Sequence, residues 1–427
     1  MIFTEQISYT LQSLCLRAEI CGLRKERITM KRIYIITISS ALLVILAAFG
    51  LHLLTKDDGE QRTITAGFVY VGDTSTAYTG NFVKAQKAVE KKYGDRVRTI
   101  ARFNVTEGSE DGILKELVEE GCDIIFTTSF GFGEKAKQWA AKYPKVQFCQ
   151  STCSNANEEP KLSNYHTYMG AIYQGRYISG VVAGMKLKQL IEEGIITEDQ
   201  AKVGYVGAYP YAEVISGYTA FFLGVRSVLP SAEMTVKYTN TWGSYALEKK
   251  YAAQLINEGC VIISQHSDTT GPAVACEEVK GKHVVYHVGY NQSMADVAPT
   301  TYLTGCRINW EPYISAAVEA VLSDKDIEGS LDANINGNDV GAGFDQSWVQ
   351  MLEVNELIAA PGTKEEIEKL IGRFKKKEIN VFQGDYTGVD PDDPKDVISL
   401  KKAYHENEKS SAPTFHYVLQ DVIHVEE

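Results

Sequence analysis

The sequence predicts an α/β protein whose body forms two lobes, each with a parallel sheet covered by helices. From residue 63 onward, short apolar segments typical of strands alternate with amphipathic segments typical of helices, a pattern that favours parallel sheets. About eight such strands over roughly 250 residues are more than one small core normally holds, so two lobes are expected. The length of 427 residues agrees with more than one domain.

The composition is that of an ordinary globular protein, with 44% hydrophobic and 23% charged residues. The formal net charge is −12, and phosphate backbones are bound by basic surfaces. The charge therefore argues against nucleic acid as the main partner.

The first element along the chain is an apolar segment at residues 33–54, IYIITISSALLVILAAFGLHLL. It is long enough to cross a bilayer core of about 30 Å. Lys31 and Arg32 precede it, and positive flanks stay in the cytoplasm, so the body is expected outside the cell membrane. Residues 1–62 are thus interpreted as a cytoplasmic stub, a membrane anchor or signal segment, and a linker. Cleavage near residues 48–50 and translation from Met30 remain alternatives.

Strands and helices are expected in alternation over the next 250 residues. The expected strands are ITAGFVYVG, DIIFTTS, KVQFCQ, KVGYVGA, EMTVKYTN, CVIISQHS, HVVYHVGY and TYLTGCRI. The expected helices between them include NFVKAQKAVEKKYG, EKAKQWAAKY, GYTAFFLGVRSVL and YALEKKYAAQLINEG.

The turns after these strands are the expected ligand site, because open parallel sheets bind ligands beyond the carboxyl ends of their strands. Several of these turns carry an aromatic residue beside an Asp, Asn or Ser, a combination that suits a planar heterocycle with two ring faces and a polar edge. Ordinary core packing is the alternative for each aromatic residue. The candidate ligand-binding residues are Asp73, Tyr78, Phe130, Phe132, Trp242, Asp268, Asn291 and Trp310.

Seven segments, in order along residues 64–384, resemble the basic membrane protein (BMP) family of ABC-transporter solute-binding lipoproteins, whose best-known relatives are purine nucleoside receptors. The segments are ITAGFVYVGDTSTAYTGNF, CDIIFTTSFGFGEKAKQWAAKYPKVQF, YMGAIYQGRYISGVVAGM, KVGYVGAYPY, YTNTWGSYALEKKYAAQLINEGCVIISQHSD, VGYNQSM and RINWEPYISAAVEAV. The resemblance implies a type I periplasmic-binding-protein fold, in which two lobes close on the ligand around a hinge that the chain crosses three times.

Under this resemblance the crossings are expected near Tyr173, Ala298 and Asn334. Residues 63–173 and 298–334 would form lobe I, and residues 174–297 and 335–427 would form lobe II. Trp242 and Phe130 would sandwich the ligand ring, with Tyr78 and Trp310 completing an aromatic wall.

Asp268 would accept a hydrogen bond from a ring N–H or an amine, and Asp73 and Asn291 would bind other polar atoms of the ligand. Three departures from the family pattern stand out. No cysteine for lipidation lies between Lys31 and Thr63, which favours a transmembrane tether. Purine nucleoside receptors usually carry an acid where this chain has Asn291, and often a lysine where it has Asn309 and Trp310.

The changes at Asn291 and at Asn309 and Trp310 resemble a subgroup of the family. For that subgroup both a free purine base and a nucleoside remain possible ligands. The predicted function is a receptor on the extracytoplasmic face of a bacterial membrane that delivers such a ligand to an ABC permease with a separate ATPase subunit. It is expected to be a monomer without cofactor or metal. No catalytic residues are expected, because no nucleophile elbow or phosphate loop is visible in the sequence. A membrane-anchored sensor and a nucleoside-cleaving enzyme are the alternatives.

Overall fold

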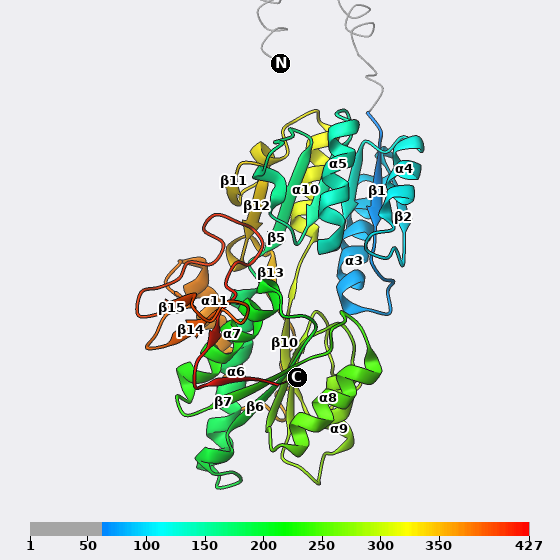
Figure 1. Cartoon of the computed structure of the whole chain (residues 1–427). Helices are drawn as coiled ribbons and strands as arrows, with labels where there is room; N and C mark the ends of the chain where they lie inside the picture. Colours follow the sequence, from blue (N-terminus) through cyan, green and yellow to red (C-terminus); the bar gives the residue numbers. More distant parts are fainter. Residues whose placement is uncertain (1–61, 427) are drawn as a thin grey trace, which may run out of the picture. The chain divides into compact units, whose positions relative to one another are not determined.

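The computed structural model describes residues 62–426, which form two α/β lobes with one seven-stranded sheet each and a smaller three-stranded sheet (Figure 1). The predicted fold class is therefore confirmed. The predicted apolar segment at residues 33–54 lies outside the described residues. Within residues 62–426, no helix combines the length and the apolar character that a bilayer crossing requires.

The sheet of lobe I is parallel except at the β11–β12 edge. Its strands, in spatial order, are β11 (Asn334–Asn336), β12 (Asp339–Ala342), β5 (Tyr165–Gly170), β4 (Gln147–Ser151), β3 (Ile124–Thr127), β1 (Ile64–Val69) and β2 (Val97–Arg102). Helices α3 (Ala77–Tyr93) and α10 (Glu311–Leu322) pack on one face, and α4 (Glu110–Glu119) and α5 (Gly133–Lys142) pack on the other. Both faces are buried, so β1 is apolar at successive positions: Phe68 points to one core and Val69 to the other.

The sheet of lobe II repeats this plan. Its strands, in spatial order, are β13 (Val349–Met351), β10 (Tyr302–Ile308), β9 (Tyr286–Tyr290), β8 (Ile262–His266), β6 (Lys202–Gly207), β7 (Glu233–Tyr238) and β17 (Ile423–Glu426). Helices α6 (Tyr173–Glu192) and α7 (Ala212–Val228) cover one face, and α8 (Tyr245–Asn257) and α9 (Gly271–Glu278) cover the other.

In both sheets the first strand of the lobe lies inside the sheet. The second strand is added on one side of it, and the next three strands are added on the other side, which reverses the order. The orders β2-β1-β3-β4-β5 and β7-β6-β8-β9-β10 place the reversal between β1 and β3 in lobe I and between β6 and β8 in lobe II. Such topological switch points open a crevice at the carboxyl ends of the strands, where α/β proteins bind their ligands.

Helices α6 and α7 approach so closely that only glycine fits at the contact. A Cβ atom on Gly180 would lie 1.8 Å from the carbonyl oxygen of Phe221, and one on Gly224 would lie 2.1 Å from that of Tyr177. The close contact holds α6, which begins directly after the first passage between the lobes, firmly against the rest of lobe II.

The three passages between the sheets correct two predicted boundaries. The chain leaves lobe I at residues 171–172, returns to it at 309–310 and leaves it again at 343–348. The boundaries predicted near Ala298 and Asn334 come too early, since β10 pairs along its length with β9 of lobe II and β11–β12 extend the sheet of lobe I. Which sheet a strand joins depends on its hydrogen-bonded neighbours, and its own apolar pattern does not contain that information.

The C-terminal region contacts both lobes, although the sequence placed all of residues 335–427 in lobe II. It contains α11 (Thr363–Lys375) and the small sheet of β14 (Thr387–Val389), β15 (Val397–Ser399) and β16 (Val418–Leu419). The backbone N–H of Ser411 donates to Asp339 of lobe I at 2.7 Å, and Ser216 of lobe II donates to Glu406 at 2.7 Å. Residues 404–416 therefore link the two lobes outside the three passages.

Candidate ligand-binding site

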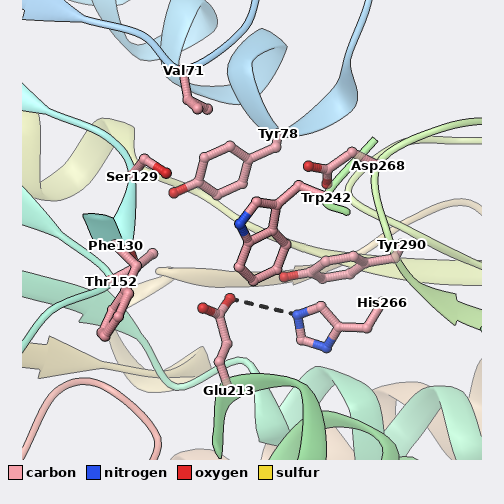
Figure 2. A pocket seen from close by; sticks show the side chains of 10 residues that line it. All are labelled: Val71, Tyr78, Ser129, Phe130, Thr152, Glu213, Trp242, His266, Asp268 and Tyr290. Atoms are coloured by element: carbon pink, nitrogen blue, oxygen red, sulfur yellow. Dashed lines mark ion pairs between the residues drawn. The ribbon is translucent and has the colours of Figure 1, made fainter. Parts of the chain in front are cut away.

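A narrow cavity of about 30 Å³ lies where the switch points of the two sheets face each other (Figure 2). Its lining residues follow strand ends of both lobes: Val71, Tyr78, Ser129, Phe130 and Thr152 from lobe I, and Glu213, Trp242, His266, Asp268 and Tyr290 from lobe II. This volume is far below the range for small-molecule sites, so a ligand that touches both lobes enters only when the lobes move apart.

On the side of lobe I, Tyr78 is held in place by helix α3 and by two neighbouring rings. Its hydroxyl donates to the carbonyl oxygen of Thr128, at the end of β3. Its ring meets Phe82 and Trp310 edge to face, with centroids 5.2 and 6.3 Å away. Phe130, by contrast, is 54% exposed and thus free to cover a ligand ring from the mouth of the cavity.

On the side of lobe II, Trp242 stands in the middle of the cavity wall (Figure 2). Its ring meets Tyr209 edge to face at 5.3 Å, and its carbonyl oxygen accepts from the backbone N–H of Asp268 at 2.9 Å. That bond ties the turn after β7 to the turn after β8. The buried carboxylate of Glu248 fixes the same turn, accepting from Ser267 at 2.8 Å and from the N–H of Thr269 at 3.1 Å.

Two carboxyl groups face the cavity, and burial raises the pKa of both. Desolvation raises the pKa of Glu213 to about 7, while the nearby Arg176 acts in the opposite direction. The pKa of Asp268 is raised well above its usual range, first by burial and then by the charges of Glu248 and Glu213. A carboxyl with a raised pKa can donate a hydrogen bond when protonated and accept one when ionised.

His266 lies beside Glu213, with Nε2 3.5 Å from a carboxylate oxygen (Figure 2). Burial and the charge of Arg176 lower the pKa of His266 well below its usual value, so the imidazole is neutral near pH 7. The contact is therefore a polar contact between neighbours rather than an ion pair at that pH.

The structure brings four of the eight predicted site residues together in this cavity: Tyr78, Phe130, Trp242 and Asp268. The other four lie outside its lining: Asp73, Phe132, Asn291 and Trp310.

Each of these four has a structural role of its own. Asp73, in the loop after β1, accepts hydrogen bonds from the Ser75 backbone and from Asn104, which follows β2. Phe132 is buried in the core between the sheet of lobe I and α5. Asn291 adopts a positive φ of 63°, and its carbonyl oxygen accepts from Asn81 at 2.9 Å. Trp310 is 2% exposed and stacks on Phe82 with centroids 4.2 Å apart, so it supports Tyr78 from behind.

The site also contains residues that the sequence reasoning passed over, above all Glu213, His266 and Tyr290. All three lie at or just after the carboxyl end of a strand, so the rule that singled out the turns also covers them. Selection of aromatic residues beside Asp, Asn or Ser within those turns excluded Glu213 and His266.

A second cavity of about 340 Å³ continues from the first toward solvent and shares Phe130, Thr152, Glu213 and Trp242 with it. Its outer wall comes from the C-terminal region, including Asp390 and His416. The ligand atoms of Asp390, Asp396 and His416 lie within 4.8 Å of one another, a spacing that could hold a metal ion. All three side chains are at least partly exposed, and His416 already pairs with both carboxylates at 3.6 and 3.9 Å.

Two α/β lobes, three passages between them and a cavity between facing strand ends define the fold seen in solved structures of solute-binding proteins. Residues 69–383 match the family model described as ABC transporter substrate-binding protein PnrA-like, and the chain belongs to this Bmp family. The resemblance found in the sequence is thereby confirmed. The family is one of extracytoplasmic substrate-binding proteins rather than of enzymes.

Two curated relatives cover most of the matched region. The chain is 29% identical over 326 residues to a purine-binding protein of Brucella abortus, covering 76% of this chain and 84% of that protein. It is also 29% identical over 323 residues to a putative ABC transporter glucose-binding protein, TsgA13, of Haloferax volcanii, covering 73% and 75% respectively.

Solved structures of low sequence identity share the fold. A solute-binding protein of Conexibacter woesei has a TM-score of 0.56 at 15% identity, covering 74% of this chain and 98% of its own. One from Aeropyrum pernix has a TM-score of 0.61 at 13% identity, covering 74% and 92%.

Proposed function

We propose that this protein captures a purine base or nucleoside outside the cytoplasm and delivers it to an ABC permease driven by a separate ATPase subunit. The observation that carries the proposal is the set of residues that line the first cavity, which we call the inner cavity. Aromatic rings from both lobes line it together with two carboxyl groups. Rings can cover the two faces of a planar heterocycle, and carboxyl groups can bind its polar edge.

Each lobe supplies two of the aromatic rings that line the inner cavity. Phe130 and Tyr78 belong to lobe I, and Trp242 and Tyr290 belong to lobe II. A flat ligand held between Phe130 and Trp242 therefore favours the closed arrangement of the lobes. A ligand that binds one state better shifts the population toward that state, which gives the permease a liganded form to recognise.

A sugar is the competing ligand class, since one relative is named a putative glucose-binding protein. A sugar ring presents hydroxyl groups around its whole edge, and each one buried needs a partner. Five side chains of the inner cavity could bind such hydroxyls besides the tyrosine hydroxyls: Ser129, Thr152, Glu213, His266 and Asp268. The ring-rich wall favours the heterocycle.

The deciding experiment is calorimetry on residues 63–427 with hypoxanthine, adenine, inosine, adenosine and glucose, after unfolding and refolding to remove any bound molecule. Purines should bind and glucose should not. At a free ligand concentration of 100 Kd, a purine should raise the free energy of unfolding by about 2.7 kcal/mol. Selective binding of glucose would overturn the purine assignment and leave the family membership intact.

Transport is tested separately in cells. Deletion of the gene should abolish uptake of the labelled purine at low external concentration, and a plasmid copy should restore it. Unchanged uptake together with a changed transcriptional response to the purine would favour the anchored-sensor alternative. Release of the free base from inosine by the purified protein would favour the enzyme alternative.

A further inference from the structure

The second cavity, which we call the outer cavity, lies between the inner cavity and solvent. Its volume of about 340 Å³ falls within the range for small-molecule sites, whereas the inner cavity measures only about 30 Å³. The two cavities share four lining residues: Phe130, Thr152, Glu213 and Trp242. A ligand whose ring contacts Trp242 would therefore place a larger substituent in the outer cavity.

Thr152 offers an unpaired polar group where the two cavities meet. It directly follows β4, is 4% exposed, and its hydroxyl has no hydrogen-bond partner among the described residues. Its φ of 58° lies in the left-handed region, which a β-branched residue rarely adopts. A buried hydroxyl without a partner costs free energy, and strained residues cluster at ligand sites. A polar ligand atom at this point would supply the missing partner.

The outer wall of this cavity carries an excess of negative charge. Asp390 and Asp392 of the C-terminal region line it. The loop that bears them, residues 390–396 between β14 and β15, contains four aspartates and one lysine. Because aspartate side chains are ionised at neutral pH, four negative charges of the loop stand against one positive charge.

His416 can offset only a part of this charge. Among the described residues that line the outer cavity, it is the one that can carry a positive charge. Its Nε2 lies 3.6 Å from a carboxylate oxygen of Asp390 and 3.9 Å from one of Asp396. A protonated His416 would balance one carboxylate and leave the others. The side chain of Asp390 is 18% exposed, so salt screens its charge less than on an open surface.

The amino end of α7 also lines the outer cavity, through Tyr211, Ala212 and Glu213. The amino end of a helix attracts anions. The first turn of α7 already contains the carboxyl group of Glu213, which can satisfy this preference from within the chain.

We propose that the outer cavity selects ligands by charge, with Asp390 and Asp392 rejecting ligands that carry a phosphate group and admitting neutral or cationic ones. A phosphate monoester carries a charge of about −1.5 to −2 at pH 7 and is typically bound by basic side chains. In this cavity it would face carboxylates instead. Both aspartates lie beyond residue 383, so the selection belongs to a part of the chain that the family model does not cover. The identity of the ligand rests on the proposed function, whereas the charge of the cavity does not.

Fluorescence quenching of Trp242 tests the charge of the outer cavity without any ligand. The chain has four tryptophans, and the other three, Trp139, Trp310 and Trp348, are 9%, 2% and 2% exposed. Trp242 is half-buried and lines both cavities, so a quencher in solution reaches it most readily. Iodide, caesium and acrylamide then report how the cavity treats an anion, a cation and a neutral molecule.

The variant combines Asp390→Asn with Asp392→Asn and is measured at constant ionic strength with EDTA present, so that no metal ion neutralises the loop. Asparagine at position 390 can still accept the hydrogen bond of 2.8 Å from the backbone N–H of residue 392. Iodide should quench this variant about twofold more strongly than the wild type, and caesium should quench it less. Acrylamide should quench both proteins equally. Equal quenching by iodide in the two proteins would overturn the charge selection.

The matched control combines Glu198→Gln with Asp199→Asn. Both residues are exposed and precede the amino end of β6, whereas the cavities lie at the carboxyl end of that sheet. The control removes the same number of negative charges from the molecule. It should leave quenching by all three agents as in the wild type.

The selection itself is measured by calorimetry with inosine and its 5′-monophosphate. The wild type should bind the monophosphate at least about 100-fold more weakly than inosine, because like charges in a partly desolvated site repel strongly. The combined Asp390→Asn and Asp392→Asn variant should narrow this ratio at least about tenfold. The matched control should keep the ratio of the wild type.

Equal affinity of the wild type for inosine and its monophosphate would refute the selection. Absence of binding by any purine or nucleoside would instead reject the proposed ligand class, and the quenching comparison would still decide whether the cavity excludes anions.

Discussion

At the scale of single residues, the aromatic side chains of the cavity divide into those that can touch a ligand and those that support them. Trp242 lines the cavity and remains half-buried, so part of its surface is available to a ligand. Trp310 is fully enclosed by Phe82, Tyr78 and Tyr168. Replacement of Trp242 is therefore expected to lower ligand affinity, and replacement of Trp310 is expected to lower the stability of the fold.

Trp242→Ala should weaken purine binding at least about 30-fold, because removal of a stacked anchor commonly costs 2 kcal/mol or more. Trp242→Phe should keep more affinity than Trp242→Ala, since a smaller ring still stacks. Calorimetry measures both, and circular dichroism confirms that each variant is folded. An unchanged affinity in folded Trp242→Ala would rule out stacking on this ring.

Trp310→Ala should mainly lower stability, by about 3–5 kcal/mol, because it opens a cavity in the core of lobe I. Its purine affinity, measured well below the unfolding temperature, should fall much less than that of Trp242→Ala. The measurement is a urea unfolding curve beside a calorimetric titration. A large loss of affinity with unchanged stability would show instead that Trp310 contacts the ligand.

At the scale of elements, the packing of α6 against α7 determines where Arg176 and Glu213 stand. Arg176 lies at the start of α6 and Glu213 at the start of α7. Further along each helix, Gly180 of α6 and Gly224 of α7 lie directly against the backbone of the other helix. A change at this contact should therefore affect stability and, through the helix positions, the cavity.

Gly180→Ala should destabilise the protein by about 3 kcal/mol or prevent folding, because the new Cβ would overlap the carbonyl oxygen of Phe221. Gly112→Ala is the matched control, since nothing lies within 4 Å of a Cβ atom there and alanine favours a helix. Thermal unfolding of both variants measures the difference. Equal melting temperatures for the two would show that α6 and α7 can move apart freely.

At the scale of the whole molecule, the two sheets are joined by three passages and by residues 404–416. Asp339 and Glu406 are the buried carboxyl groups that anchor this C-terminal link to the two lobes. All of this link lies beyond residue 383, where the family match ends, and its residues Ala412, Pro413 and His416 line the second cavity. Closure of the lobes therefore has to accommodate this additional connection.

The location of the whole molecule is predicted from the segment at residues 33–54. Cell fractionation should recover the intact protein with membranes, and added protease should cut it only from the outer side. Immunoblotting of spheroplasts with and without protease measures this. A soluble mature form that begins near Leu51 would show instead that the segment is a cleaved signal.

The sequence by itself determined the fold class and the positions of most strands along the chain. Alternating apolar and amphipathic segments predicted β1, β3, β4 and β6 to β10, because local burial leaves a local pattern. Strand β2, an edge strand that includes the charged residues Arg98 and Arg102, lacked that signal. The rule that ligands bind at strand ends was enough to select Tyr78, Phe130, Trp242 and Asp268.

Only the tertiary structure decided which sheet β10 joins, which aromatic rings face the cavity and which face the core. Phe132 and Trp310 have the same local sequence character as Phe130 and Trp242, and they differ only in what packs on them. Arg176 lies more than 30 residues before Glu213, and the packing of α6 against α7 brings their two helices together. Side-chain direction and the balance of buried charge depend on contacts between distant segments, and no local pattern records those contacts.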